Sequence, residues 1–296
     1  MTAAPIDTVL PQHRSHSRRF AEHRFVYPVV SRRSRGISIG VNLNPDKVCN
    51  FDCIYCQVDR RSTVETRFVE IDQMLAELAA VIETTQSGDL YQHSQFVSVP
   101  SSLRRLNDIA FSGDGEPTTY RNFDEIIRRT AVLKAAHHLS DVKLVLITNA
   151  SMFHRPVVQR GLALLDQNQG EIWAKLDAGT EAYFQLIERT SIPFQRILNN
   201  LTAAARVRPL VIQSLFLRLQ GEPPSVAEIE AYIGCLRDIV TAGGQLQRIQ
   251  IYSVARPPLT VIDQGADFVT ALTTEELEAI GDRVRTATAL SVEVFA

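Results

Sequence analysis

Short runs of apolar residues alternate with longer segments of helical periodicity along most of this chain, and this alternation restricts its fold more than any other feature. The runs are rich in Val, Ile and Leu, as expected for parallel strands that are covered on both faces. We expect strands at residues 36–43, 109–113, 142–148, 171–177, 210–219, 247–255 and 291–295.

The segments between these runs have the apolar spacing of helices that pack on a sheet. In residues 70–85, for example, Ile71, Met74, Leu78 and Ile82 fall on one helical face. We expect further helices near 122–137, 155–167, 225–241 and 274–288, and two helical stretches that end near residue 207. Six β/α units and a last strand suit an open doubly wound sheet or a barrel, full or partial. Both place functional residues at the C-terminal ends of the strands.

Composition favours an ordinary globular protein. The chain has 296 residues, 45% of them hydrophobic, which is enough to bury a sizeable core. No apolar run approaches the roughly 20 residues that cross a bilayer. A twin arginine, Arg18 and Arg19, is followed by Glu22, His23 and Arg24 where an export signal requires an apolar stretch. We therefore expect a cytoplasmic protein without membrane contact, in a compartment that keeps thiols reduced.

The first 35 residues are basic, although the whole chain has a net charge of −2. They hold seven arginines against Asp7 and Glu22, a charge of +5. Three interpretations stay open: an arm that binds RNA phosphates or an acidic partner, a solvated leader, and an organelle transit peptide. The arginines are Arg14, Arg18, Arg19, Arg24, Arg32, Arg33 and Arg35.

We divide the chain into a basic N-terminal extension, residues 1–35, and one catalytic domain, residues 36–296. Residues 87–108 form an insertion within that domain, either a connector between two units or a lid over the site.

Three of the four cysteines lie in one short stretch, CNFDCIYCQVD, with the spacing C-x3-C-x2-C. Three thiolates cannot complete the tetrahedral ligation of structural zinc. On a four-iron cluster they leave one iron open to a small molecule. The fourth cysteine, Cys235, falls among the apolar positions of a helix and is expected in the core.

The cysteine loop, with Tyr55 directly before its last cysteine, resembles the signature of the radical S-adenosylmethionine enzymes. The stretch SGDGEPT (112–118) resembles that family's Gly-Gly-Glu-Pro stretch, with Asp114 and Gly115 where two glycines are usual. The stretches ITNA, AKLDAG, IQSLF and YSVARPP follow in order at the ends of later strands. The likeness covers residues 36–260 and is greatest to the branch of the tRNA wybutosine-synthesising enzymes, whose extra N-terminal cysteines this chain lacks.

The resemblance implies an α/β fold, a partial (β/α)6 barrel behind the N-terminal extension. It implies a 4Fe-4S cluster on Cys49, Cys53 and Cys56, and S-adenosylmethionine bound across the strand ends. The residues expected to contact S-adenosylmethionine are Tyr55, Gly113, Asp114, Gly115, Glu116, Asn149, Lys175, Asp177, Ser214 and Val254. Gly115→Val is expected to weaken that binding and to leave the cluster in place.

The implied reaction cleaves S-adenosylmethionine to methionine and a 5′-deoxyadenosyl radical, which abstracts hydrogen from a substrate. A flavodoxin or ferredoxin would supply the electron. Lys175 and Asp177 could instead form an ion pair in the barrel interior. The substrate stays open between RNA, reached through the basic arm, and a peptide, a protein or a small metabolite.

The alternative of another class is a zinc-binding module without enzymatic activity, completed by a distant histidine such as His23 or His93. A G-x-x-x-x-G-K-[ST] phosphate loop does not occur in the sequence.

Overall fold

The structure is a computed structural model that describes residues 20–64 and 66–296. Its main feature is an eight-stranded sheet in the order β1-β2-β3-β4-β5-β6-β8-β10. β1 runs antiparallel to β2, and all other neighbours are parallel. The strands are β1 (Val26–Ser31), β2 (Gly36–Val41), β3 (Leu106–Phe111), β4 (Lys143–Thr148), β5 (Gly170–Lys175), β6 (Leu210–Leu215), β8 (Leu246–Tyr252) and β10 (Val292–Phe295).

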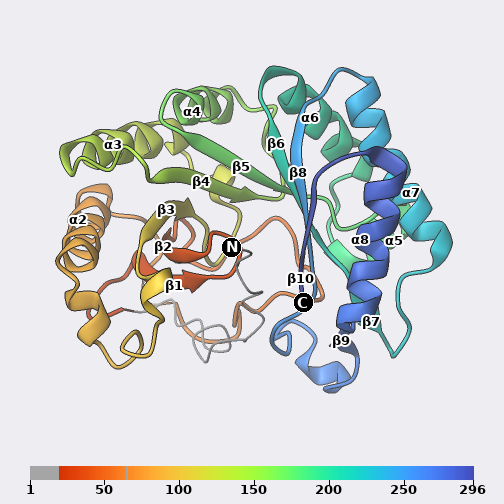
Figure 1. Cartoon of the computed structure of the whole chain (residues 1–296), viewed down its shortest axis with the longest axis horizontal. Coiled ribbons are helices and arrows are strands. Elements are labelled where there is room, and N and C mark those ends of the chain that lie inside the picture. Colours follow the sequence, from red (N-terminus) through yellow and green to blue (C-terminus); the bar gives the residue numbers. More distant parts are fainter. Residues whose placement is uncertain (1–19, 65) are drawn as a thin grey trace, which may run out of the picture.

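Helices cover the outer face of the curved sheet (Figure 1). They are α2 (Ile71–Ser87), α3 (Phe123–Ala136), α4 (Pro156–Asp166), α5 (Glu181–Glu188), α6 (Phe194–Val207), α7 (Val226–Thr241) and α8 (Thr274–Thr288). The α/β partial barrel that the resemblance implies, one of the folds that the alternating pattern allows, is confirmed, and so are the two helices between β5 and β6. None of the helices in the described part of the chain is both long and apolar enough to span a membrane.

β1 was not predicted, because we assigned it to the basic extension. Its residues form the edge of the sheet, where Pro28 is tolerated because one side of the strand makes no ladder hydrogen bonds. A tight turn that contains Arg35, at φ 57°, leads into β2. Arg14, Arg18, Arg19 and Asp7 lie outside the described residues.

The predicted strand 210–219 is two strands. β6 ends at Leu215, and β7 (Leu217–Leu219) turns away to pair antiparallel with β9 (Val269–Ala271) in a second, two-stranded sheet. The break between β6 and β7 was not predicted, and β9 was missed, because three-residue elements leave no periodic signal.

The main core lies between the sheet and the helices, and Cys235 is buried in it, as expected. A smaller apolar cluster of Ala110, Val145, Trp173 and Val211 lies on the inner face of the sheet. Polar and apolar side chains of that inner face line a cavity.

Residues 87–108 behave as a connector. They contain two short 3-10 turns, η1 (Asp89–Gln92) and η2 (Ser101–Leu103), and bury Leu90, Phe96 and Val99 before β3 begins.

Candidate functional site

A cavity of about 390 Å³ lies inside the curved sheet, and a second of about 270 Å³ shares part of its wall. Their shared wall includes Cys49, Cys53, Gly113, Gly115 and Lys175, which follow or end β2, β3 and β5. The larger cavity also reaches Glu116 and Asn149, and the smaller one reaches Tyr55, Cys56, Asp114 and Val254. Most of the predicted site residues therefore meet at one edge of the sheet.

The cysteine loop is fixed to the end of α5. The amides of Asp52 and Ile54 donate to the carbonyls of Glu188 (3.0 Å) and Ile187 (2.9 Å). Phe51 packs edge-on against Phe184 of the same helix, with ring centroids 5.7 Å apart. On the other side, the hydroxyl of Thr260 donates to the carbonyl of Cys53 (2.9 Å). These contacts hold the loop in place without using the thiols.

Gly113 and Gly115 lie where the segment after β3 passes directly against the cysteine loop. A Cβ on Gly115 would stand 2.2 Å from the carbonyl oxygen of Val48, the residue before Cys49. A Cβ on Gly113 would stand 2.2 Å from Oδ1 of Asn42. Asp114, between the two glycines, also contacts Asn42, whose Nδ2 donates to the Asp114 carboxylate at 2.6 Å. Gly115 is therefore required by the chain directly before Cys49, and Gly113 by Asn42 at the end of β2, reasons that the sequence did not reveal.

Glu116 joins the ends of β3 and β4. Its buried carboxylate accepts from the hydroxyl of Thr148 (2.6 Å) and from the amide of Asn149 (2.7 Å). Burial raises the pKa of Glu116 above its usual value. Asn149 in turn donates from Nδ2 to Asn50 Oδ1 in the cysteine loop at 2.9 Å. The pair thus links β3, β4 and the loop.

Lys175 and Asp177 form an ion pair of 2.9 Å at the end of β5. Burial is the largest single effect and acts to lower the pKa of Lys175, but Asp177 together with Tyr252, Glu188 and Cys53 outweighs it, and the pKa lies well above the usual value. Asp177 also accepts from the Tyr55 hydroxyl (2.5 Å) and the Leu215 amide (2.7 Å). The ammonium of Lys175 lies over the Tyr55 ring, 4.6 Å from its centroid. Tyr55 is thereby held on the wall of the cavity, while Asp177 lies behind it.

Glu188 is a site residue that the sequence analysis missed. Its buried carboxylate accepts from the Cys53 thiol (2.6 Å) and the Tyr55 hydroxyl (3.0 Å). Burial and the nearby Asp177 raise the pKa of Glu188 to about 8. Burial and the Glu188 carboxylate raise the pKa of Cys53 well above its usual value. A glutamate at the last position of a short helix carries no sequence pattern that would mark it.

Ser214 does not join the other predicted residues. Its hydroxyl lies 2.6 Å from the Tyr232 hydroxyl of α7 and is fully buried on the outer face of the sheet. Successive residues of a strand point to opposite faces, so that Gln213 and Leu215 take the inner positions. The prediction placed Ser214 at a strand end correctly but on the wrong face.

The three cysteines of the loop lie around the smaller cavity. Within residues 20–64 and 66–296, no three Cys, His, Asp or Glu side chains converge on one ion position. His23 and His93 pack against the ring of Phe20, and neither lines the two cavities. The three thiols lie around a shared cavity, with Arg60 Nη2 3.9 Å from Cys56 Sγ. Three thiols at one cavity are the ligand number of a four-iron cluster with one open iron, whereas structural zinc takes four protein ligands.

Comparisons with known proteins agree with this geometry. The Radical SAM superfamily matches residues 43–219, more than half of the chain. A UPF0026 protein of Helicobacter pylori strain J99 is 25% identical over 78% of this chain and 66% of its own length. GTPase Obg of Brachyspira hyodysenteriae is 27% identical over 61% of this chain and 23% of its own length. The chain thus spans less than two thirds of the length of these relatives.

Among solved structures, TYW1 with a lysine-pyruvate adduct bound has a TM-score of 0.53 and 17% identity, over 86% of this chain and 74% of the other. At this identity the likeness concerns the fold alone. TYW1 belongs to the wybutosine-synthesising enzymes, the branch that the motifs indicated. The family match, the partial barrel and the cysteine loop lead to one conclusion: the chain belongs to the radical SAM superfamily.

Proposed function

We propose that the chain is an enzyme that binds a 4Fe-4S cluster through Cys49, Cys53 and Cys56 and cleaves S-adenosylmethionine. The observation that carries this proposal is that the cysteine loop lines the larger cavity together with Gly113, Gly115, Glu116 and Asn149. When both cofactors are bound, they supply a 5′-deoxyadenosyl radical that abstracts hydrogen from a substrate. A flavodoxin or ferredoxin type donor would provide the electron, in a compartment such as the cytoplasm that keeps the thiols reduced.

The residues around the cavity would hold and shield the cofactors. Tyr55, Val254 and the backbone of residues 113–115 line the cavity that contains all three thiols, so they are the candidates to contact S-adenosylmethionine. Glu116 would position Asn149, because its carboxylate is already occupied by Thr148 and Asn149. Asp177 would keep Lys175 and Tyr55 in place. Ser214 is left out of this proposal because it faces α7.

The lysine adduct of TYW1 does not extend to Lys175 on this geometry. An amine must be neutral to attack a carbonyl group. Asp177 and the other groups around Lys175 together keep its pKa well above the usual value despite burial, so that the ammonium form is favoured. Nor does the relative named GTPase Obg suggest GTP hydrolysis, since this chain has no phosphate-loop pattern.

The hypothesis that the substrate is RNA was based on the arginines of the basic N-terminal extension. In the described part of the chain, Arg32 and Arg33 line the cavity, so that these two are not part of an outer RNA-binding surface. An RNA substrate is therefore tested together with other pools below.

The test is anaerobic reconstitution with iron and sulfide, followed by reduction in the presence of S-adenosylmethionine and measurement of 5′-deoxyadenosine. We expect slow release without substrate, and faster release with one of three pools: bulk tRNA, peptides or small metabolites. Cys53→Ala should lose the activity, whereas the matched control Cys235→Ala should keep it because Cys235 lies in the core. A reconstituted protein that holds iron but releases no 5′-deoxyadenosine would contradict the proposal.

A further inference from the structure

Arg60 is a charged side chain at the cysteine cavity that the proposed cofactor binding does not use. It lines the smaller cavity together with all three thiols of the loop. Its Nη2 lies 3.9 Å from Cys56 Sγ, within reach of an N–H···S hydrogen bond. Burial raises the pKa of the Cys49 thiol, and Arg60 acts against burial there. One guanidinium group therefore lies close to two of the three sulfur atoms.

A tight turn directly after the cysteine loop places Arg60. Asp59 Oδ1 accepts from the amides of Arg61 (3.0 Å) and Ser62 (3.3 Å), which fixes the backbone of this turn. Arg60 is partly buried, whereas Arg61 is exposed and forms an ion pair with Asp263 at the surface. Two neighbouring arginines thus have different surroundings, one at the thiols and the other in solvent.

The charge of Arg60 is not neutralised by a carboxylate within residues 20–64 and 66–296. No ion pair of Arg60 occurs there, whereas Arg61 has one. The Arg60 Nε is buried and has no hydrogen-bond partner among the same residues. Buried polar atoms without a partner are rare in proteins, and an arginine cannot escape the cost by losing its proton. An anionic group in the cavity would satisfy both the charge and the Nε–H.

A 4Fe-4S cluster on the three cysteines would be such an anionic group. Hydrogen bonds to the cluster sulfurs are one of the ways in which a protein sets the reduction potential. The Nε–H and one Nη2–H of a guanidinium donate from the same edge of the planar group. With Nη2 at the Cys56 sulfur, the Arg60 Nε can therefore reach a second sulfur of the same cluster.

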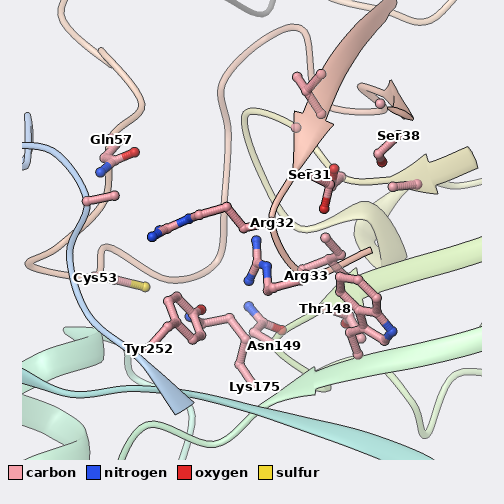
Figure 2. Close-up of a pocket in the computed structure, with 18 of the residues that line it drawn as sticks. Ser31, Arg32, Arg33, Ser38, Cys53, Gln57, Thr148, Asn149, Lys175 and Tyr252 are labelled. Carbon is pink, nitrogen blue, oxygen red and sulfur yellow. The ribbon is translucent and has the colours of Figure 1, made fainter. Parts of the chain in front are cut away.

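Two other arginines reach the larger cavity but are engaged differently. Figure 2 shows Arg32 and Arg33 extending into it. The Arg33 guanidinium lies over the ring of Tyr252, 5.0 Å from its centroid, and Arg32 Nη1 donates to the backbone oxygen of Ala296 at 2.6 Å. These contacts do not involve the cysteines, in contrast to the contact of Arg60.

We propose that Arg60 raises the reduction potential of the cluster by donating from Nη2 to the Cys56 sulfur and from Nε to a sulfide of the cluster. In this step the cluster gains one electron, the external donor loses it, and no bond forms or breaks. The added negative charge is stabilised by the guanidinium and its hydrogen bonds. Electron transfer from a flavodoxin or ferredoxin type donor becomes easier. The inference rests on the proposed function and deepens it by assigning control of the cluster to one residue.

The test is a redox titration of the reconstituted full chain, followed by electron paramagnetic resonance of the reduced cluster without S-adenosylmethionine. Arg60→Gln should lower the equilibrium constant for reduction about tenfold, which is about 59 mV in the midpoint potential of a one-electron couple. Arg60→Lys keeps the charge but has no Nε–H, so its potential should lie between the two. Arg61→Gln is the matched control and should leave the potential unchanged, because Arg61 is exposed and pairs with Asp263.

A second measurement detects the hydrogen bond itself. Pulsed electron paramagnetic resonance of a chain with isotope-labelled arginine nitrogens should show a nitrogen coupling to the reduced cluster. This coupling should be lost in Arg60→Gln and kept in Arg61→Gln. If Arg60→Gln takes up too little iron for a titration, Arg60→Lys replaces it, and its potential should still lie below that of the unmodified chain.

The inference is overturned if Arg60→Gln keeps the potential of the unmodified chain or if Arg61→Gln shifts it equally. It is also overturned if Arg60→Gln loses iron while Arg60→Lys keeps both the potential and the nitrogen coupling, which would leave Arg60 a structural role only. Failure of the proposed function is distinguishable, because the unmodified chain would then hold no four-iron cluster or release no 5′-deoxyadenosine. A missing cluster would remove both proposals, whereas a cluster without S-adenosylmethionine cleavage, but with the shift in Arg60→Gln, would remove only the radical chemistry.

Discussion

Gly115→Ala should damage the cysteine loop before any cofactor is bound. The new Cβ would stand 2.2 Å from the Val48 carbonyl and 2.8 Å from Cβ of Asn44. Non-bonded atoms of this kind normally lie about 3.5 Å apart, so the backbone before Cys49 must move by roughly 1 Å. Overpacking of this extent costs about 1–3 kcal/mol. Gly234→Ala in α7 is the matched control, because nothing lies within 4 Å of its new Cβ.

The assay is urea unfolding of the cluster-free protein, followed by measurement of iron after reconstitution. Gly115→Ala should lower the unfolding midpoint and reduce the iron content. Gly234→Ala should raise the midpoint, because alanine replaces glycine inside a helix at a gain of about 0.5–1 kcal/mol. This expectation differs from that made from sequence, in which Gly115 served only S-adenosylmethionine and its replacement spared the cluster. Normal stability and iron content in Gly115→Ala would show that the contact with Val48 is not as close as described.

Two further changes test the buried charges. Burial raises the pKa of Asp108 to about 6 in the folded chain, against an ordinary value of 3.8; Glu171 acts in the same direction, whereas Ser38, Ser34 and Arg33 act to lower it. The contribution of Asp108 to folding stability is complete below about pH 4 and is lost as the pH rises through 6, a loss of about 3 kcal/mol. Asp108→Asn removes this titration, so its urea-unfolding midpoint should depend less on pH than that of the unmodified chain. If the two proteins have parallel pH profiles, the carboxyl is not desolvated. Asp177→Ala should destabilise the fold by about 3–5 kcal/mol, because it leaves Lys175 buried without its partner. Exposed ion pairs contribute less than about 1 kcal/mol. A change of that size in urea unfolding would show that the pair is solvated.

The order of strands and helices could be predicted because apolar runs and helical periodicity report on burial, which the parallel sheet imposes on every unit. β1 escaped prediction because it pairs only at an edge, includes Pro28 and adjoins Arg32 and Arg33. The turn after it carries Arg32 and Arg33, which line the larger cavity. From sequence alone, a run of charged residues next to a short strand is interpreted as a solvated tail.

The candidate site was predictable where chemistry is tied to local spacing, as in Cys49, Cys53 and Cys56. Glu188, Asn50 and Asp108 could not be found, since their partners lie far away in the sequence: Glu188 contacts Cys53, and Asp108 contacts Ser38. Ser214 shows the opposite error. It lies at a strand end, as predicted, but its side chain points to the helix side of the sheet. A strand that is buried on both faces has no alternation of polar and apolar residues, so the sequence does not indicate to which face a side chain points.

The most direct test of the central claim is electron paramagnetic resonance of the reconstituted, reduced chain with and without S-adenosylmethionine, together with iron and sulfide analysis. Three cysteine ligands leave one iron open, so we expect about four irons and four sulfides per chain and a cluster spectrum that changes when S-adenosylmethionine is added. Cys235→Ala should give the same result. A protein with one zinc and no iron, or a four-iron cluster whose spectrum is unaffected by S-adenosylmethionine, would contradict the account.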